Sequence, residues 1–209
     1  MRRLIFVLVV GIAGLAVLLS LGAWQMQRMA WKQQILDTID ARVDADPVAL
    51  PVNPDPVADK YTPVRLTGEL VEGELHVLVS TRDLGPGFRV IVPFVTDDGR
   101  RILVDRGYVQ TAAKDAIRNS GKVELFGNLH WPDEADSYTP QPDIAANIWY
   151  ARDVDTMSAA LDTLPIMVVL NDHPVNGSFV IPMPVDTASI PNNHLQYAIT
   201  WFSLAFIWA

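Results

Sequence analysis

The residues of this chain that could bind a metal or move a proton are few and scattered. Its four histidines stand at positions 76, 130, 173 and 194, and cysteine is absent. The lack of cysteine excludes disulfides, thiol chemistry, zinc sites built on thiolates and iron-sulfur clusters. His76, His130 and His173 have no second histidine at the i,i+3 or i,i+4 spacing of a metal site on a helix. A zinc or di-iron centre would have to be assembled from distant positions.

Nucleophilic catalysis is not indicated either. The only Gly-Ser pair, Gly177-Ser178, lacks the strand, turn and helix of a nucleophile elbow. Asp172 followed by His173 could be half of a catalytic triad, but a dipeptide has no specificity and we favour a surface turn ahead of Pro174. The two glycines around a proline in "LGPGFR" make a turn and not a phosphate-binding loop. We therefore expect a protein that is not an enzyme.

His194 differs from the other histidines because it stands where polar sequence meets an apolar run, in "PNNHLQYAITWFSLAFIWA". Two interpretations are open at this stage. Asn192 and Asn193 can cap a helix, and a histidine followed by Tyr197 and Trp201 is typical of the aromatic belt at a membrane surface. The other interpretation is that His194 holds a ligand.

The first element that must position these residues is an apolar segment, residues 4–23, "LIFVLVVGIAGLAVLLSLGA", in which only Ser20 is polar. As a helix it spans about 30 Å, the thickness of a hydrocarbon core. A cleaved signal peptide is the alternative. The segment exceeds an h-region of about 7 to 15 residues and no A-x-A-like site precedes Trp24. We expect a retained transmembrane helix.

Residues 24–46 are expected to continue this helix out of the bilayer, up to the Pro-rich linker "PVALPVNPDP". Trp24 and Trp31 suit the headgroup zone, because the ring is apolar and its N–H still finds a partner. Arg28 and Lys32 follow the span as closely as Arg2 and Arg3 precede it, so the positive-inside count leaves the orientation nearly tied. We favour a cytoplasmic N-terminus, because large acidic domains are translocated largely regardless of charge.

The second element is the uncharged stretch 195–209, which as a helix spans only about 22 Å. That is short for a membrane crossing. A re-entrant segment and a buried core helix are alternatives, but we favour the start of a second transmembrane helix that continues beyond Ala209 in the native protein. The domain between the two spans is then held on one face of the membrane.

Residues 57–190 are the predicted extramembrane domain. Short alternating or β-branched runs follow one another: "TPVRLTGEL", "ELHVLVS", "FRVIVPFV", "RILVDRGYV", "KVELFGNL", "IWYAR", "IMVVLN" and "SFVIP". They predict an antiparallel β domain, either a sandwich or a partial barrel. The clearest hairpin is "VTDDGRRILV", with Asp98 and Gly99 at positive φ in the turn.

Two helices are expected within the domain, a short one in "TAAKDAIR" and one in "DVDTMSAALDTL" that begins at the N-cap Asp153. The second repeats apolar residues on one face: Val154, Met157, Leu161 and Leu164. The expected fold is thus an α+β membrane protein, in which two transmembrane helices flank a mainly antiparallel β domain with one or two helices.

The acidic charge of the chain lies in this middle part. The formal net charge is -8, and every acidic residue falls between Asp37 and Asp186. Nucleic-acid binding needs a basic surface that displaces counterions from phosphates. We therefore expect no nucleic-acid partner.

Five phrases in order resemble one family: "LGAWQMQRMAWK", "YTPVRLTGE", "GPGFRVIVPF", "ILVDRGYV" and "NNHLQYAITWF", spread from Gly22 to Phe202. Together they are similar to the Surfeit locus protein 1 family of cytochrome c oxidase assembly factors. The resemblance implies a multi-pass protein of the bacterial inner membrane with its main domain on the periplasmic side. It also implies a role in respiratory chain biogenesis, furnishing haem a to subunit I of the oxidase.

The resemblance also names a candidate site. His194 matches a histidine considered in the family as a haem ligand, and neutral imidazole is a ligand of haem iron. Tyr197 and Trp201 could then approach or pack on the macrocycle from the same helix face. Trp24, Arg28 and Lys32 could anchor the first helix at the headgroups, or the two cations could meet haem propionates.

The expected partners are subunit I and membrane lipid, and the haem a synthase is a further candidate. The alternative function is that of a chaperone or scaffold that stabilises subunit I without binding haem. In that case His194 is an ordinary residue of the membrane interface.

Overall fold

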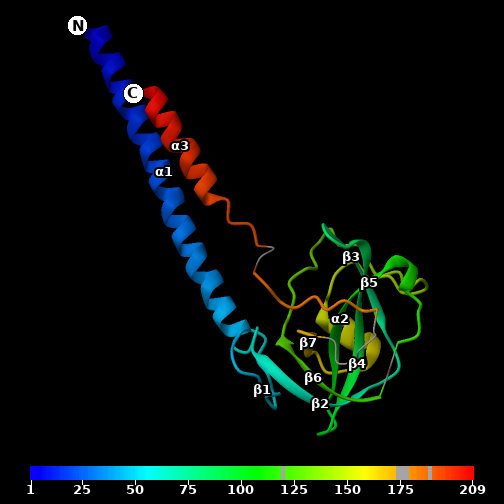
Figure 1. The fold of residues 1–209 in the computed structure, drawn as a ribbon. Coiled ribbons are helices and arrows are strands. Elements are labelled where there is room, and N and C mark those ends of the chain that lie inside the picture. Colours follow the sequence, from blue (N-terminus) through cyan, green and yellow to red (C-terminus); the bar gives the residue numbers. More distant parts are fainter. Residues whose placement is uncertain (119–120, 173–178, 188–189) are drawn as a thin grey trace. The chain divides into compact units, whose positions relative to one another are not determined.

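The computed structural model of the 209-residue chain describes residues 1–118, 121–172, 179–187 and 190–209 (Figure 1). Within them the chain forms two compact units, a helical unit of Met1–Ala41 with Asp186–Ala209 and a β unit of Arg42–Val185. The elements in chain order are α1 (Arg2–Val43), β1 (Val48–Ala49), β2 (Pro63–Leu70), β3 (Leu75–Thr81), β4 (Gly85–Thr96), β5 (Arg101–Gln110), the 3-10 turn η1 (Thr111–Ala113), β6 (Gly121–Leu129), α2 (Val154–Leu161), β7 (Met167–Leu170) and α3 (His194–Trp208).

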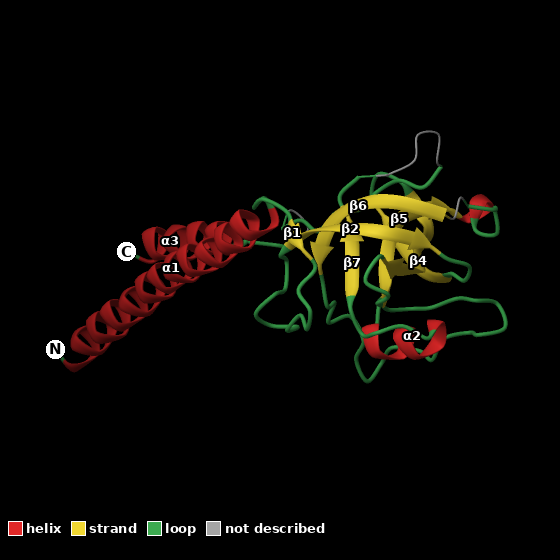
Figure 2. Ribbon diagram, turned by 90° about the horizontal axis from the view of Figure 1, so that it is seen from below, coloured by secondary structure: helices red, strands yellow, loops and turns green. Residues whose placement is uncertain are grey.

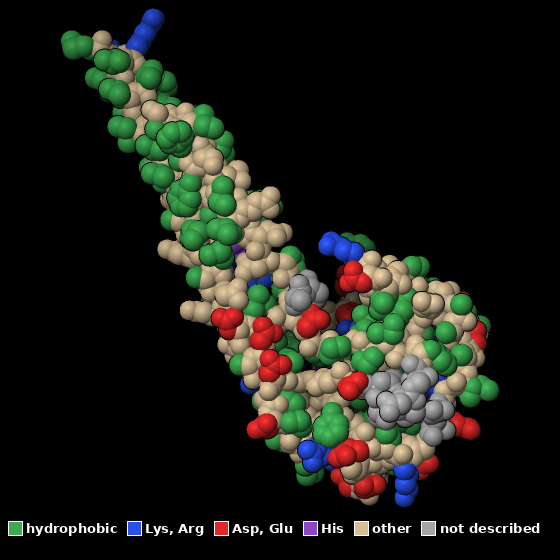
Figure 3. All heavy atoms as spheres, in the orientation of Figure 1, with side chains coloured by type: hydrophobic (Ala, Val, Ile, Leu, Met, Phe, Trp, Pro, Cys, Tyr) green, Lys and Arg blue, Asp and Glu red, His purple; other side chains and the backbone are tan. Residues whose placement is uncertain are grey.

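Helix α1 contains both predicted N-terminal segments in one continuous helix of 42 residues, which ends at Val43, short of the predicted 46. Among the described residues it is the one helix long and apolar enough to cross a membrane. Its apolar side chains are exposed over the first half, where Figure 3 shows hydrophobic groups covering the helix. A helix with apolar groups all round and no protein core about it is suited to lipid.

Helix α3 packs antiparallel against the N-terminal half of α1. Trp208 Nε1 donates to the carbonyl of Gly11 at 2.9 Å. A Cβ on Gly14 would lie 2.7 Å from the Trp208 ring, and one on Gly22 would lie 2.6 Å from the Phe202 ring. The aromatic rings therefore occupy the space that the glycines leave, as small residues allow between membrane helices.

One face of α1 makes these contacts. Its less exposed residues recur every three or four positions, as expected of a helix packed on one side. They include Gly11, Gly14, Leu18, Gly22, Gln25, Met29, Lys32 and Leu36. At 15 residues, α3 is shorter than a full membrane crossing. Of the two predicted transmembrane helices, the structure thus bears out only α1, by length and composition.

The β unit is a closed barrel and not a sandwich (Figure 2). In the described part of the chain β2 pairs with both β6 and β4, so β2, β6, β7, β5 and β4 form a ring. The long strand β4 makes this possible, because its first half pairs with β3 and its last residues pair with β2. Most pairs are antiparallel, as predicted, but β5 with β7 and β1 with β2 are parallel.

Both faces of β5 are buried. Ile102 and Val104 point into the barrel core, whereas Leu103 packs outside it with Met157 of α2 and with Met167. A strand covered on both faces reads as a continuous apolar run instead of an alternating one, which explains "ILV" in this strand. Helix α2 is therefore the cover of one outer face of the barrel.

Most of the predicted strands are confirmed, with β2 to β7 falling on six of the eight runs. The prediction of strands in "IWYAR" and "SFVIP" was wrong for their described residues, which contribute isolated bridges instead. Trp149 bridges Val77 in parallel, and Ile181 bridges Tyr108. The predicted hairpin "VTDDGRRILV" is confirmed as the β4–β5 turn, with Gly99 at φ 86°. The prediction of positive φ at Asp98 was wrong, because Gly99 alone supplies it in this turn.

One predicted helix is confirmed and the other is not. Asp153 caps α2, because its side chain accepts from Thr156 N at 3.2 Å, but Leu164 of the predicted apolar face lies beyond the helix end. The segment "TAAKDAIR" forms only the short turn η1. Arg118 explains the difference, since its guanidinium donates to the carbonyls of Ala113, Lys114 and Ala116. Those carbonyls are satisfied without a continuing helix.

Candidate functional site

The candidate site lies in the helical unit, where α3 begins. His194 is the first residue of the helix and is half-buried. The predicted capping is wrong in its detail, because Asn193 occupies the N-cap position but makes no side-chain cap hydrogen bond. Asn192 instead donates to Gln33 Oε1 of α1 at 3.5 Å. The polar residues before α3 are thus directed toward α1.

Gln25 of α1 is the direct partner of His194. The imidazole Nδ1 lies 2.8 Å from Gln25 Oε1. An amide oxygen only accepts, so the hydrogen between them is carried by Nδ1 of the imidazole. In the neutral ring Nε2 then has the lone pair, which is the form of histidine that binds a metal through Nε2.

Further polar contacts hold the chain before α3 along α1. Lys32 Nζ donates to the carbonyl of Pro191, and Thr187 Oγ1 donates to Asp40 Oδ1 at 2.7 Å. Together with Gln25, these α1 residues lie about two helical turns apart, on one face. The start of α3 is therefore fastened to α1 at several points.

The structure distributes the other predicted site residues over both helices. Tyr197 and Trp201 follow His194 by three and seven positions on α3, with Tyr197 exposed and Trp201 half-buried. Trp24 and Arg28 lie one turn apart on α1, both exposed. Arg28 extends over the ring of Trp31, 4.5 Å from its centroid. The haem-related roles of these residues stay predictions.

Sequence reasoning missed Gln25. The phrase "LGAWQMQRMAWK" drew attention to its tryptophans and cations, although Gln25 is a neutral polar residue within one turn of the apolar segment. That position was the available signal, because a polar group at the edge of a membrane helix needs a partner. Nothing local could have named His194 as that partner.

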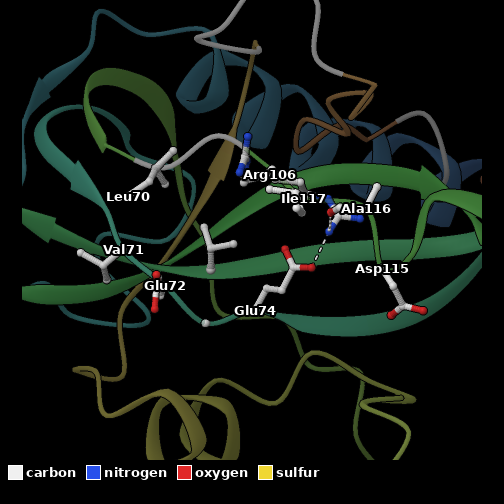
Figure 4. A pocket seen from close by; sticks show the side chains of 11 residues that line it. Leu70, Val71, Glu72, Glu74, Arg106, Asp115, Ala116 and Ile117 are labelled. Atoms are coloured by element: carbon white, nitrogen blue, oxygen red, sulfur yellow. Dashed lines mark hydrogen bonds and ion pairs between the residues drawn. The ribbon is translucent and has the colours of Figure 1, made fainter.

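A second polar cluster lies in the β unit, beside a pocket of ≈ 330 Å³ (Figure 4). Arg118 donates to Glu74 Oε1, and His76 Nε2 lies 2.8 Å from the same oxygen. Burial raises the pKa of Glu74, but the hydrogen bond from His76 and the charge of Arg118 outweigh it, so the net shift is downward. His76 is only 3% exposed, and we interpret this cluster as part of the folded core.

Arg106 is buried beside the same pocket; burial and the charge of Arg118 lower its pKa, and the charge of Glu74 raises it. In the same strand as Arg106, the buried Asp105 accepts from Arg89 Nε at 2.7 Å.

Metal ligands are not gathered elsewhere in the described residues, where no group of three or more His, Asp or Glu side chains could hold an ion. His130 is mostly covered and lies beside the ring of Tyr61, with centroids 5.5 Å apart. The Asp172-His173 and Gly177-Ser178 pairs fall wholly or partly outside the residues that the structure describes.

Comparison with known proteins covers nearly the whole chain. The profile of the SURF1 family matches residues 12–206. Surfeit locus protein 1 of Xenopus tropicalis is 30% identical over 213 residues, which cover 88% of this chain and 67% of that protein. The human protein of the same name is 30% identical over 217 residues, covering 89% and 69%. A SURF1-like protein of Rickettsia felis is 29% identical over 200 residues, covering 90% and 87%.

Proposed function

Because the chain belongs to the SURF1 family, we propose that it is a membrane-anchored assembly factor of cytochrome c oxidase that assists the delivery of haem a to subunit I. In this role haem a is a cargo, held for a time and then released. The apolar helix α1 supports the anchoring. We further propose that the anchor lies in the inner membrane, with α3 as a second membrane segment and the β unit on the periplasmic side.

The observation that carries this proposal is the setting of His194. It is half-buried at the start of an apolar helix, and its Nδ1 is bonded to Gln25 so that Nε2 has the lone pair. A donor set of one neutral imidazole fits haem iron, and a single axial ligand suits a cargo that must leave again. Haem a would supply the redox-active iron of the oxidase after transfer.

Other side chains of the two helices fit the rest of such a cargo. Trp201 and Tyr197 offer aromatic surface to a macrocycle from α3, and Trp24 does so from α1. Arg28 is exposed and can turn from the ring of Trp31 toward a propionate. The apolar exterior of α1 is suited to an isoprenoid tail in the lipid.

A scaffold for subunit I that does not bind haem is the second candidate. The exposed Trp24 and Tyr197, at 51% and 56%, favour it, because they also suit an aromatic belt with no ligand present. Subunit I remains the partner in that case, and the haem a synthase is a further partner only if the cargo is received directly.

The test is to co-express the full chain with the haem a biosynthetic enzymes and to record the optical spectrum of the purified protein. We expect a Soret band in the wild type, its loss in His194→Ala and its retention in the control His130→Phe, which removes a histidine of the β unit. Equal haem content in the wild type and His194→Ala would overturn the ligand role. Co-purified subunit I with no haem spectrum would favour the scaffold.

The proposed topology has its own test. Alkaline phosphatase fused within the β unit is active only in the periplasm, so we expect activity for a fusion in the Asp97–Gly99 turn and none for a fusion before Arg2. The reverse pattern would contradict the periplasmic side.

A further inference from the structure

We propose that Gln25 is a positioning residue, which holds His194 in the tautomer that leaves Nε2 free to bind haem iron. The inference rests on the proposed function, in which His194 is the axial ligand. Gln25 Oε1 and His194 Nδ1 are 2.8 Å apart, although the two residues are separated by 169 positions in the chain. The residue would act through His194 and would not itself touch the iron.

The chemistry requires such a residue. A neutral imidazole exists in two tautomers, and the one protonated at Nε2 has no lone pair there for a metal. Metal-binding histidines usually donate their other ring N–H to an oxygen, which fixes the tautomer and the ring orientation and makes the ligating nitrogen more basic. A carboxylate, carbonyl or water commonly supplies this oxygen, and here the amide of Gln25 does.

The placement of Gln25 on α1 is specific. Gln25 belongs to the less exposed stripe of α1, three residues after Gly22, whereas Gln27 is exposed and outside that stripe. The close approach of Phe202 to Gly22 brings the two helices together next to this hydrogen bond. The contact between Gly22 and Phe202 and the hydrogen bonds of Lys32 and Asp40 hold α3 close to α1. The Gln25 side chain can therefore reach the imidazole of His194.

A simpler role is that Gln25 only fastens α3 to α1. Gln33, Lys32 and Asp40 already make contacts of that kind with the chain before α3. If Gln25 only held α3 against α1, these residues would share that role. Removing Gln25 would then not change which ring nitrogen of His194 carries the proton. The tautomer is therefore the property that separates the two roles.

The experiment measures the tautomer directly, without haem. The full chain is labelled with ¹⁵N-histidine, placed in lipid nanodiscs and studied by NMR, with His194 assigned from the signals lost in His194→Ala. We expect Nδ1 protonated and Nε2 unprotonated in the wild type. Gln25→Leu should shift the population toward the Nε2–H form, Gln25→Glu should retain the wild-type form because it keeps an acceptor oxygen, and the control Gln27→Leu should change nothing.

A second measurement follows haem retention after co-expression with the haem a enzymes. Loss of the oxygen that supports a ligating histidine typically lowers affinity by roughly 10- to 100-fold, so we expect that loss in Gln25→Leu, recovery in Gln25→Glu and wild-type retention in Gln27→Leu. The variant Gln33→Leu, which removes a tether but not the His194 contact, should retain haem.

The outcomes separate this inference from the proposed function. An Nε2–H tautomer in the wild type, or populations unchanged by Gln25→Leu, would overturn the role of Gln25 and leave His194 as a ligand. Haem retained by His194→Ala would overturn the proposed ligand and leave the tautomer result intact. If Gln25→Leu fails to assemble its helix pair, the wild-type tautomer and the Gln25→Glu variant still decide the question.

Discussion

Asp105 provides the sharpest prediction for the β unit, because it is fully buried and compensates two arginines. Its Oδ2 accepts from Arg89 Nε at 2.7 Å and from Arg152 Nη1 at 3.1 Å, and its Oδ1 accepts from the N–H of Gly107 at 3.0 Å. The change Asp105→Asn preserves shape and volume. It removes the charge and directs an N–H toward two guanidinium groups.

The expected cost follows from these partners. Removing one member of a buried ion pair costs about 3–5 kcal/mol, because the other charge stays buried. Arg152 keeps Glu134, whose Oε1 lies 3.0 Å from its Nε, so the loss falls mainly on Arg89. We therefore expect the lower end, about 3 kcal/mol of unfolding free energy, or roughly 6–12 °C in the melting temperature of a unit of this size.

The assay is thermal unfolding of the full chain in nanodiscs, followed by near-ultraviolet circular dichroism, with pulse proteolysis in urea as a second measure. Glu124→Gln is the matched control. Its partner Arg65 lies 3.6 Å away and both side chains are more than half exposed, so the expected cost is below about 1 kcal/mol.

A loss for Asp105→Asn no larger than that of Glu124→Gln would refute the reasoning. The double change Arg89→Met with Asp105→Leu tests the cause, because it removes the buried charge that the single change leaves behind. We expect it to be less destabilising than the sum of its single changes, since neighbouring charges are coupled. Simple additivity would show that lost packing, and not the unpaired charge, dominates.

Further predictions concern the helix pair, one histidine and one asparagine. Gly22→Leu should disrupt the helical unit and lower its resistance to protease, because the new Cβ would lie 2.6 Å from the Phe202 ring. Adding Phe202→Ala should restore part of that resistance. Unchanged resistance in Gly22→Leu would contradict the packing. Burial, aided by the charge of Arg152, lowers the pKa of His130 to about 4, so the unfolded chain binds a proton between about pH 6.5 and 4 that the folded chain does not. Stability should fall as the pH drops through this window, and less so in His130→Phe; superimposable pH profiles would exclude this role. Asn128 is fully buried and donates to two backbone carbonyls, so Asn128→Ala should cost about 1–3 kcal/mol in urea unfolding, and a loss below about 0.5 kcal/mol would show that water replaces the amide.

Local patterns in the sequence were enough for much of the fold. The apolar run 4–23 lies in one long helix, and six alternating or apolar runs became strands because side-chain period and turn residues are local properties. Asp153 was identifiable as a helix cap for the same reason. The short segment after β5 was predicted as a helix and is not one, because the guanidinium of its last residue, Arg118, bonds the carbonyls of Ala113 and Lys114.

The barrel closure could not be predicted, since it depends on β2 pairing with β4 and β6 at once. When two strands far apart in the chain pair, the sequence of each strand shows only that it has an apolar face, and does not show which strand it pairs with. The parallel insertion of β7 beside β5 is of the same kind.

The sequence by itself determined that His194 stands at the edge of an apolar helix, because the change from polar to apolar residues is visible along the chain. Only the tertiary structure showed which side chain lies beside Nδ1 of that histidine, because Gln25 is 169 positions away and reaches it only when α3 folds back on α1. Asp105 shows the same division, since its two arginines come from other parts of the chain. A buried polar group needs a hydrogen-bond partner, and the sequence shows that such a group is present but not which residue becomes its partner.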